Sequence, residues 1–139
     1  MLHKLFKFKG GVKPDTNKTA SVNAPIGVAP IPRRLIVPLH QSIGGKPSPL
    51  VEPGQYVRKG QRIGGPDQWL SSAVHAPTSG TVLAVEEHIS PHPSGLPTLS
   101  VLIETDGRDE WIERAPVDYK NLPPERVREI LRDAGVVGL

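Results

Sequence analysis

The sequence has 139 residues, a length typical of one domain, and such a domain buries roughly two-thirds of the surface that its unfolded chain exposes. Its 16 prolines and 14 glycines predict many turns, and the absence of cysteine excludes disulfides, a thiolate nucleophile and cysteine-ligated zinc or iron–sulfur centres in this chain. The net charge of +3 is unevenly distributed, because residues 1–34 carry seven Lys or Arg against Asp15 alone. This basic segment could meet nucleic acid, anionic lipid or an acidic protein surface, or lie solvated around its own domain.

The first residues, MLHKLFKFKGG, mix basic and apolar side chains and lack the apolar core and cleavage site of a secretory signal. No stretch of the sequence approaches the roughly 20 apolar residues that cross a bilayer. We therefore expect a cytoplasmic chain that is soluble by itself and that could dock on a membrane-bound partner.

The first half of the chain predicts an extended segment followed by short strands. Residues 8–32 contain four prolines and a Gly-Gly pair without helical periodicity, so we expect an extended strap that wraps the body. Residues 34–39 (RLIVPL) are apolar with an internal proline, which favours an edge or terminal strand. Residues 49–63 (PLVEPGQYVRKGQRI) interrupt small apolar residues with Pro-Gly and Gly, which predicts strand, turn, strand and turn.

The middle of the chain has the strongest strand patterns, at residues 74–85 and 99–103. We expect each to form one strand with an apolar pleat face. These faces comprise Thr81, Leu83 and Val85 in the first strand and Leu99, Val101 and Ile103 in the second. The intervening residues 86–97 (EEHISPHPSGLP) contain three prolines and predict a loop.

The only convincing helical pattern begins near Pro123 and Pro124 and continues through ERVREILRDA. Val127, Ile130 and Leu131 are spaced for one apolar face, and Gly135 is placed to end the helix. The final residues, AGVVGL, are apolar and lack a polar termination, so we expect the chain to be a fragment of a longer protein.

Two segments are similar to lipoyl and biotinyl carrier domains, which are small flattened barrels. These are VEPGQYVRKGQRI (residues 51–63) and VHAPTSGTV (residues 74–82), in which glycines turn the strands and small β-branched residues suit a narrow interior. In carrier domains the modified lysine lies eight positions before the proline of the Ala-Pro pair. That position is Trp69 here, and no lysine occurs between Lys59 and Lys120, so a swinging arm lacks the residue that its chemistry requires.

Other side chains offer weaker chemical patterns. His88 and His92 have the spacing of metal ligands on a helix, but Ser90-Pro91 lies between them and interrupts a helix. Serine and threonine residues crowd beside His75, yet no third group is evident for a catalytic triad. The whole chain has two Phe, two Tyr and two Trp, which leaves few stacking platforms, so nucleic acid is not expected as a partner.

Several segments in fixed order resemble the C subunit of the Rnf ion-translocating electron-transport complex. They are FKGGVKPDTNK (residues 8–18), PLHQSIGGKPSPLVEPGQYVRKGQRIG (38–64), VHAPTSGTV (74–82), HPSGLPTLSVLIETDGRDEW (92–111) and DYKNLPPERVREILRDAGVVGL (118–139). Lys13 is a departure, because the family usually has histidine at that point of its G-G-x-H-P element.

The resemblance implies an all-β barrel-sandwich hybrid of the lipoyl/biotinyl kind, with an extended basic N-terminal strap and one C-terminal helix. We place the strap at residues 1–34 and the barrel-sandwich hybrid domain at residues 35–115. A linker and the helix then occupy residues 116–139 and lead into a nucleotide-binding domain outside this chain.

The resemblance also implies a function. We expect a non-catalytic docking or structural domain of a cytoplasmic subunit, held peripherally at the inner membrane by a complex that couples NADH:ferredoxin electron transfer to ion translocation. The parent subunit is expected to bind two [4Fe-4S] clusters, FMN and NADH, none of them through this chain. Its expected partners are the other subunits of the complex and the rest of its own subunit.

Charge and loop exposure select candidate contact residues. They are Lys7, Lys9, Lys13 and Lys18 in the strap, His75, Thr78 and Ser79 in the central turn, and His92 and Ser94 in the following loop. Two alternatives remain. One is the similar barrel of a sodium-pumping quinone reductase A subunit, against which residues 8–18 argue, and the other is a carrier domain modified at an unexpected lysine.

Overall fold

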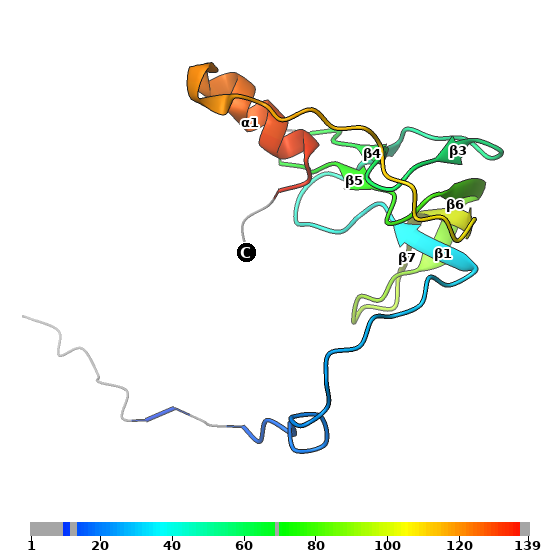
Figure 1. Cartoon of the computed structure of the whole chain (residues 1–139), viewed down its shortest axis with the longest axis vertical. Helices are drawn as coiled ribbons and strands as arrows, with labels where there is room; N and C mark the ends of the chain where they lie inside the picture. Colours follow the sequence, from blue (N-terminus) through cyan, green and yellow to red (C-terminus); the bar gives the residue numbers. More distant parts are fainter. Residues whose placement is uncertain (1–9, 12–13, 69, 137–139) are drawn as a thin grey trace, which may run out of the picture.

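The computed structural model describes residues 10–11, 14–68 and 70–136. Its elements are β1 (Arg34–Pro38), β2 (Ser48–Pro49), β3 (Tyr56–Val57), β4 (Arg62–Gly65), β5 (Val74–His75), β6 (Gly80–Ile89), β7 (Pro97–Thr105), the 3-10 helix η1 (Tyr119–Asn121) and α1 (Pro124–Asp133). Figure 1 shows the strands gathered in one body, with α1 at one side of it and the N-terminal strap leading away. The predicted all-β domain with one C-terminal helix is confirmed.

The strands form two antiparallel sheets, in the orders β1-β7-β6-β3 and β2-β4-β5. β1 lies at the edge of the larger sheet, where Pro38 stands opposite Ser100 of β7. Because proline has no N–H to give to a second neighbour, an edge position suits it, and the edge strand predicted at residues 34–39 is confirmed. The short strands predicted within residues 49–63 are confirmed as well, with turns at Pro53-Gly54 and at Gly60.

The single strand predicted at residues 74–85 is wrong, because the chain passes from one sheet to the other at residues 76–79. β5 ends in the three-stranded sheet at His75, and β6 begins in the four-stranded sheet at Gly80. Pro77 cannot donate to a strand ladder. Gly80 permits a very close approach of β7, since a Cβ at this position would lie 2.2 Å from the carbonyl oxygen of Glu104. Residues 76–79 are therefore the corner that joins the two sheets.

A β-bulge decides which side chains of β6 face the interior. The register against β7 shifts between Val82 and Ala84, which leaves Leu83 as the extra residue. Val82 is buried before the bulge and Val85 packs against the core after it, whereas Thr81 and Leu83 are exposed. The predicted apolar face is right for Val85 and wrong for the other two residues, because one extra residue reverses the alternation of side chains.

β6 and β7 form a long hairpin that extends past the predicted strands. β6 continues to Ile89 and β7 begins at Pro97, so the predicted loop at residues 86–97 is reduced to residues 90–96. On β7, Val101 and Ile103 are buried as predicted, and Leu99 is exposed nearer the tip.

Aliphatic side chains from both sheets form the core. The buried cluster comprises Val37, Leu39, Val51, Val57, Ile63, Val74, Ala76, Val82, Val101 and Ile103, with Leu35 and Val85 packed against it. Burial of each valine, leucine or isoleucine stabilises the fold by about 1.5–3 kcal/mol relative to exposure. Small β-branched residues dominate the cluster, as the narrow interior of a small barrel requires.

α1 is attached to the smaller sheet through its C-terminal end. Arg62 Nη1 lies 2.9 Å from Asp133 Oδ1, and the Ala73 N–H donates to the Arg132 carbonyl at 3.3 Å. Gly135 follows with a φ of 75°, so it ends the helix in the left-handed conformation, as predicted. The predicted apolar face consists of Val127, Ile130 and Leu131. Every residue of α1 is at least partly exposed, so this face lies beside the core and not in it.

The strap is exposed throughout residues 14–33 and runs away from the barrel in Figure 1. The described residues of the strap before β1 form a turn at residues 18–24 and no helix or strand. The strap joins the barrel where the Thr105 hydroxyl donates to the Pro32 carbonyl at 2.6 Å and the Thr105 N–H donates to the Arg33 carbonyl at 2.9 Å. The expectation that the strap wraps the body is therefore not met over these residues.

Candidate functional site

The corner between the sheets carries a cluster of polar side chains. Thr78 and Ser79 follow Pro77 and are both buried, so each hydroxyl needs a hydrogen-bond partner. The Thr78 hydroxyl donates to Asp109 Oδ1 at 2.9 Å, and the Ser79 hydroxyl donates to Asp106 Oδ1 at 2.7 Å. Both carboxylates lie in the loop after β7, so the corner and this loop (residues 106–113) hold each other in place.

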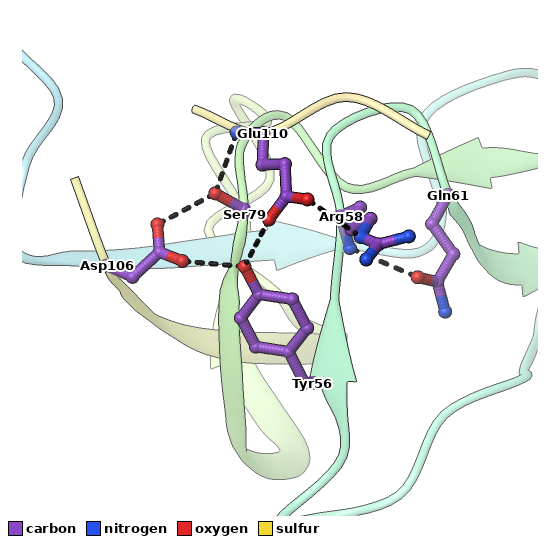
Figure 2. A network of polar contacts seen from close by, with 6 residues as sticks. All are labelled: Tyr56, Arg58, Gln61, Ser79, Asp106 and Glu110. Atoms are coloured by element: carbon purple, nitrogen blue, oxygen red, sulfur yellow. Dashed lines mark hydrogen bonds and ion pairs between the residues drawn. The ribbon is translucent and has the colours of Figure 1, made fainter. Parts of the chain in front are cut away.

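Figure 2 shows the hydrogen bonds around Ser79, which we call the corner network. The Tyr56 hydroxyl donates to Asp106 Oδ2 at 2.7 Å, and the Glu110 N–H donates to the Ser79 hydroxyl at 2.9 Å. The bond from Tyr56 is the largest cause that lowers the pKa of Asp106 to about 2, with the Arg108 N–H and the Ser79 hydroxyl adding to it. The same bond to Asp106 raises the pKa of Tyr56. Asp106 is therefore an ionised acceptor at neutral pH and is unsuited to donate a proton.

Glu110 links β3 and the residues after it to the same network. Its Oε1 lies 3.3 Å from Arg58 Nε, and its Oε2 lies 3.3 Å from the Tyr56 hydroxyl. The Gln61 side chain accepts a hydrogen bond of 3.1 Å from the Arg58 N–H, as Figure 2 also shows. The side chains of Glu110, Arg58 and Gln61 thus form their polar contacts with other residues of this chain.

A second group of contacts lies beside the network. Lys59 Nζ is 2.6 Å from Asp109 Oδ2 and 5.0 Å from the centroid of the Trp111 ring. The Arg114 guanidinium lies 5.4 Å from the same ring and donates to the Gly60 carbonyl at 3.1 Å. The pKa of Asp109 is lowered, first by Lys59 and then by the Thr78 hydroxyl. The ion pair and the cation–π contact of Lys59, with the hydrogen bond from Arg114 to Gly60, therefore fasten the segment after β7 to the end of the barrel.

Sequence reasoning missed the acidic partners in this cluster, which are Asp106, Asp109 and Glu110. A signal was present in TDGRDE (residues 105–110), where acidic residues and a glycine directly follow an apolar strand. Gly107 and Asp109 both have positive φ angles, of 72° and 55°, which this tight loop needs. Aspartate and glycine are typical of such turns, so the turn was predictable. The hydroxyl groups that donate hydrogen bonds to its carboxylates were not predictable.

The remaining predicted contact residues lie at separate places. Lys18 is exposed in the strap, and Lys7, Lys9 and Lys13 lie outside the described residues. His75 is half-buried on β5 near Gly135 at the end of α1, and burial is the main cause that lowers its pKa. His92 and Ser94 lie exposed at the tip of the β6–β7 hairpin, with His92 Nδ1 2.9 Å from the Ser94 hydroxyl oxygen. The structure therefore brings Thr78 and Ser79 together with acidic residues and leaves the other described candidates apart from them.

The position that holds the lysine of carrier domains falls in the connection between β4 and β5, which pair in the smaller sheet. The sequence has tryptophan there, and residue 69 lies outside the described residues. Within residues 10–11, 14–68 and 70–136, no group of three or more His, Cys, Asp or Glu could hold a metal ion. None of the helices in these ranges has the length and apolarity to cross a membrane.

Two small antiparallel sheets that share an aliphatic core and are joined by an Ala-Pro corner define a barrel-sandwich hybrid domain, here without a lysine at the carrier position. Comparison with protein families shows which family of such domains the chain belongs to. Residues 6–108 match the RnfC barrel sandwich hybrid domain, and the chain belongs to this family. The resemblance to the Rnf C subunit is thus confirmed, in preference to a quinone reductase A subunit.

Curated relatives agree with the family match. The chain is 46% identical over 136 residues to the C subunit of the ion-translocating oxidoreductase complex of Pseudomonas aeruginosa, covering 97% of this chain and 18% of that protein. It is 40% identical over 137 residues to the C subunit of the proton-translocating ferredoxin:NAD(+) oxidoreductase complex of Clostridium ljungdahlii, covering 97% of this chain and 30% of that protein. The chain therefore spans less than a third of the length of these relatives.

Proposed function

We propose that this chain is the first domain of the C subunit of an ion-translocating ferredoxin:NAD oxidoreductase complex and that it acts there as a non-catalytic docking and structural module. The observation that carries the proposal is the corner network, in which the hydroxyls of Ser79 and Tyr56 both donate to Asp106. A catalytic site presents a nucleophile or an acid to a substrate, whereas these groups are engaged in fixing a loop. The names of the curated relatives support the choice of complex.

The redox groups then belong to other parts of the subunit. Iron–sulfur clusters are held by cysteine thiolates, and this chain has no cysteine. We assign the two [4Fe-4S] clusters, FMN and NADH that the family resemblance implies to segments outside residues 1–139. This domain would help to position the subunit in the complex and would not transfer electrons.

The domain is placed by this proposal on the cytoplasmic side of the inner membrane, attached through the other subunits of the complex. The strap is the favoured contact segment, because it combines seven basic residues in the first 34 with full exposure at residues 14–33. The tip of the β6–β7 hairpin, with His92 and Ser94, is a second exposed contact region. An acidic surface on a neighbouring subunit fits such a basic segment.

Charge reversal in the strap tests the docking role in the subunit at its natural length. The variants Lys7→Glu/Lys9→Glu and Lys13→Glu/Lys18→Glu are compared with Lys120→Glu/Arg126→Glu, which makes the same change of charge at two exposed positions outside the strap. We expect each strap variant to lower the recovery of the other subunits in co-purification by about tenfold at low salt, and the control to recover them normally. Equal recovery from strap and control variants would refute the strap as the contact segment.

A further inference from the structure

An open groove lies between α1, the loop at residues 40–46 and the tip of the β6–β7 hairpin. Its volume is about 1760 Å³, which exceeds the roughly 300–1,000 Å³ of ordinary small-molecule pockets. Three apolar side chains in its wall are strongly exposed: Ile43 by 90%, Leu96 by 66% and Leu131 by 46%. Exposed apolar side chains that line one groove indicate a contact with another polypeptide or a membrane.

α1, which forms one wall, lacks a covering element in the described part of the chain. A helix of ten residues is marginal in water by itself and depends on packing of its apolar face. That face is only partly covered, and the named attachments of the helix, through Arg132 and Asp133, are at its last turn. Of this face, Leu131 lines the groove, beside the charged residues Glu125, Arg128, Glu129 and Arg132 of α1.

The charges around the groove indicate which class of partner fits. Glu125 and Glu129 alternate with Arg128 and Arg132 along α1, and Lys46 lies on the facing loop. A nucleic acid or an anionic membrane surface requires a basic patch, which this mixed rim does not provide. Exposed apolar side chains among charges of both signs are typical of a protein interface.

The path of the chain indicates which polypeptide occupies the groove. Val136, the last described residue, is itself exposed in the wall of the groove. The curated relatives are several times longer than this chain, which covers 18% and 30% of two of them. A segment that continues from this point is held beside the groove at the high effective concentration of a tethered ligand. We propose that the groove seats the segment that follows residue 139 of the same subunit, an inference that rests on the proposed function as a structural module of that subunit.

Cysteine accessibility tests this proposal, because residues 1–139 contain no native cysteine. Ile43→Cys and Leu96→Cys are introduced singly into the subunit of natural length, with Leu83→Cys on the β6 bulge as the control, where the leucine is 37% exposed. Each variant is treated with N-ethylmaleimide, and the modified peptide is quantified by mass spectrometry. An open groove predicts faster labelling at positions 43 and 96 than at position 83. A seated segment reverses this order, and we expect labelling at least about tenfold slower than at the control.

Each outcome has a defined meaning. Slow labelling of both groove positions in the purified subunit supports the proposal. Fast labelling in the subunit and slow labelling in the assembled complex overturns it in favour of a different subunit, while the docking function stands. Fast labelling in the purified subunit and in the assembled complex overturns the proposal. The docking function is then judged by the charge-reversal experiment alone. Circular dichroism spectra that match the native subunit show that each variant is folded.

Discussion

The hydroxyl of Tyr56 donates a 2.7 Å hydrogen bond to Asp106, fifty residues further along the chain, and so ties β3 to the loop after β7. This bond is the main reason that the pKa of Asp106 falls from 3.8 to about 2. Between these values the unfolded chain binds more protons than the folded chain, so the free energy of unfolding rises with pH. The stabilisation is complete above about pH 4 and is lost as the pH falls through 2. We expect Asp106→Asn to lack this part of the pH profile in urea unfolding.

Tyr56→Phe tests the same bond from the donor side. Removal of the hydroxyl should return the Asp106 pKa toward its usual value and flatten the acid part of the stability profile. Tyr119→Phe is the matched control, because Tyr119 is an exposed tyrosine of η1. A Tyr56→Phe profile identical to that of Tyr119→Phe would show that the bond does not stabilise the fold.

Lys59→Met should raise the pKa of Asp109, because Lys59 is the largest cause of its lowering. The Asp109 carboxyl carbon can be followed by NMR titration from pH 2 to 6. Lys120→Met removes an equal charge from η1 and should leave this titration unchanged. If Asp109 titrates alike in both variants, the 2.6 Å ion pair is not formed in solution.

Ile103→Ala should lower the free energy of unfolding by about 2–5 kcal/mol, because Ile103 of β7 is fully buried in the core and its truncation leaves a cavity. Ile89→Ala is the matched control in the same hairpin, where the isoleucine is 76% exposed, and should change stability by no more than about 0.5 kcal/mol. Chemical unfolding measures both. Similar costs for the two variants would contradict the placement of the core.

Gly80→Ala should destabilise the domain by about 1–3 kcal/mol or more, because the added Cβ meets the Glu104 carbonyl of β7, where backbone must move. Gly27→Ala adds the same methyl group in the strap, where nothing lies within 4 Å, and should be nearly neutral. Thermal unfolding monitored by circular dichroism compares the two. A native-like melting temperature for Gly80→Ala would show that β6 and β7 approach less closely than described.

Local patterns in the sequence were sufficient for the edge strand, the turns and the end of the helix. Pro38 and Gly135 act through restrictions on their own backbone, and such effects are visible without tertiary contacts. The break at residues 76–79 and the bulge at Leu83 were mispredicted, because valines and leucines on both sides continue a plausible alternation. Only the pairing with β7 decides where that alternation stops.

The candidate site was predictable only in part. The hydroxyls of Thr78 and Ser79 were selected from the sequence as surface groups, but the fold buries them against carboxylates about thirty residues away. A chemical pattern that depends on residues so distant in sequence cannot be derived from local composition. The basic strap, in contrast, owes its charge to composition alone and was identified directly.

The pairing of β1 with β7 has a consequence for synthesis on the ribosome. Arg34 of the first strand stands opposite Glu104 of the last, so the larger sheet cannot close until that final strand has been made. At about 5–20 residues per second, this interval lasts roughly 4–14 s. During that time the apolar side chains Val37 and Leu39 stay without the strand that will cover them, and nascent chains that stop before Thr105 are expected to need chaperones.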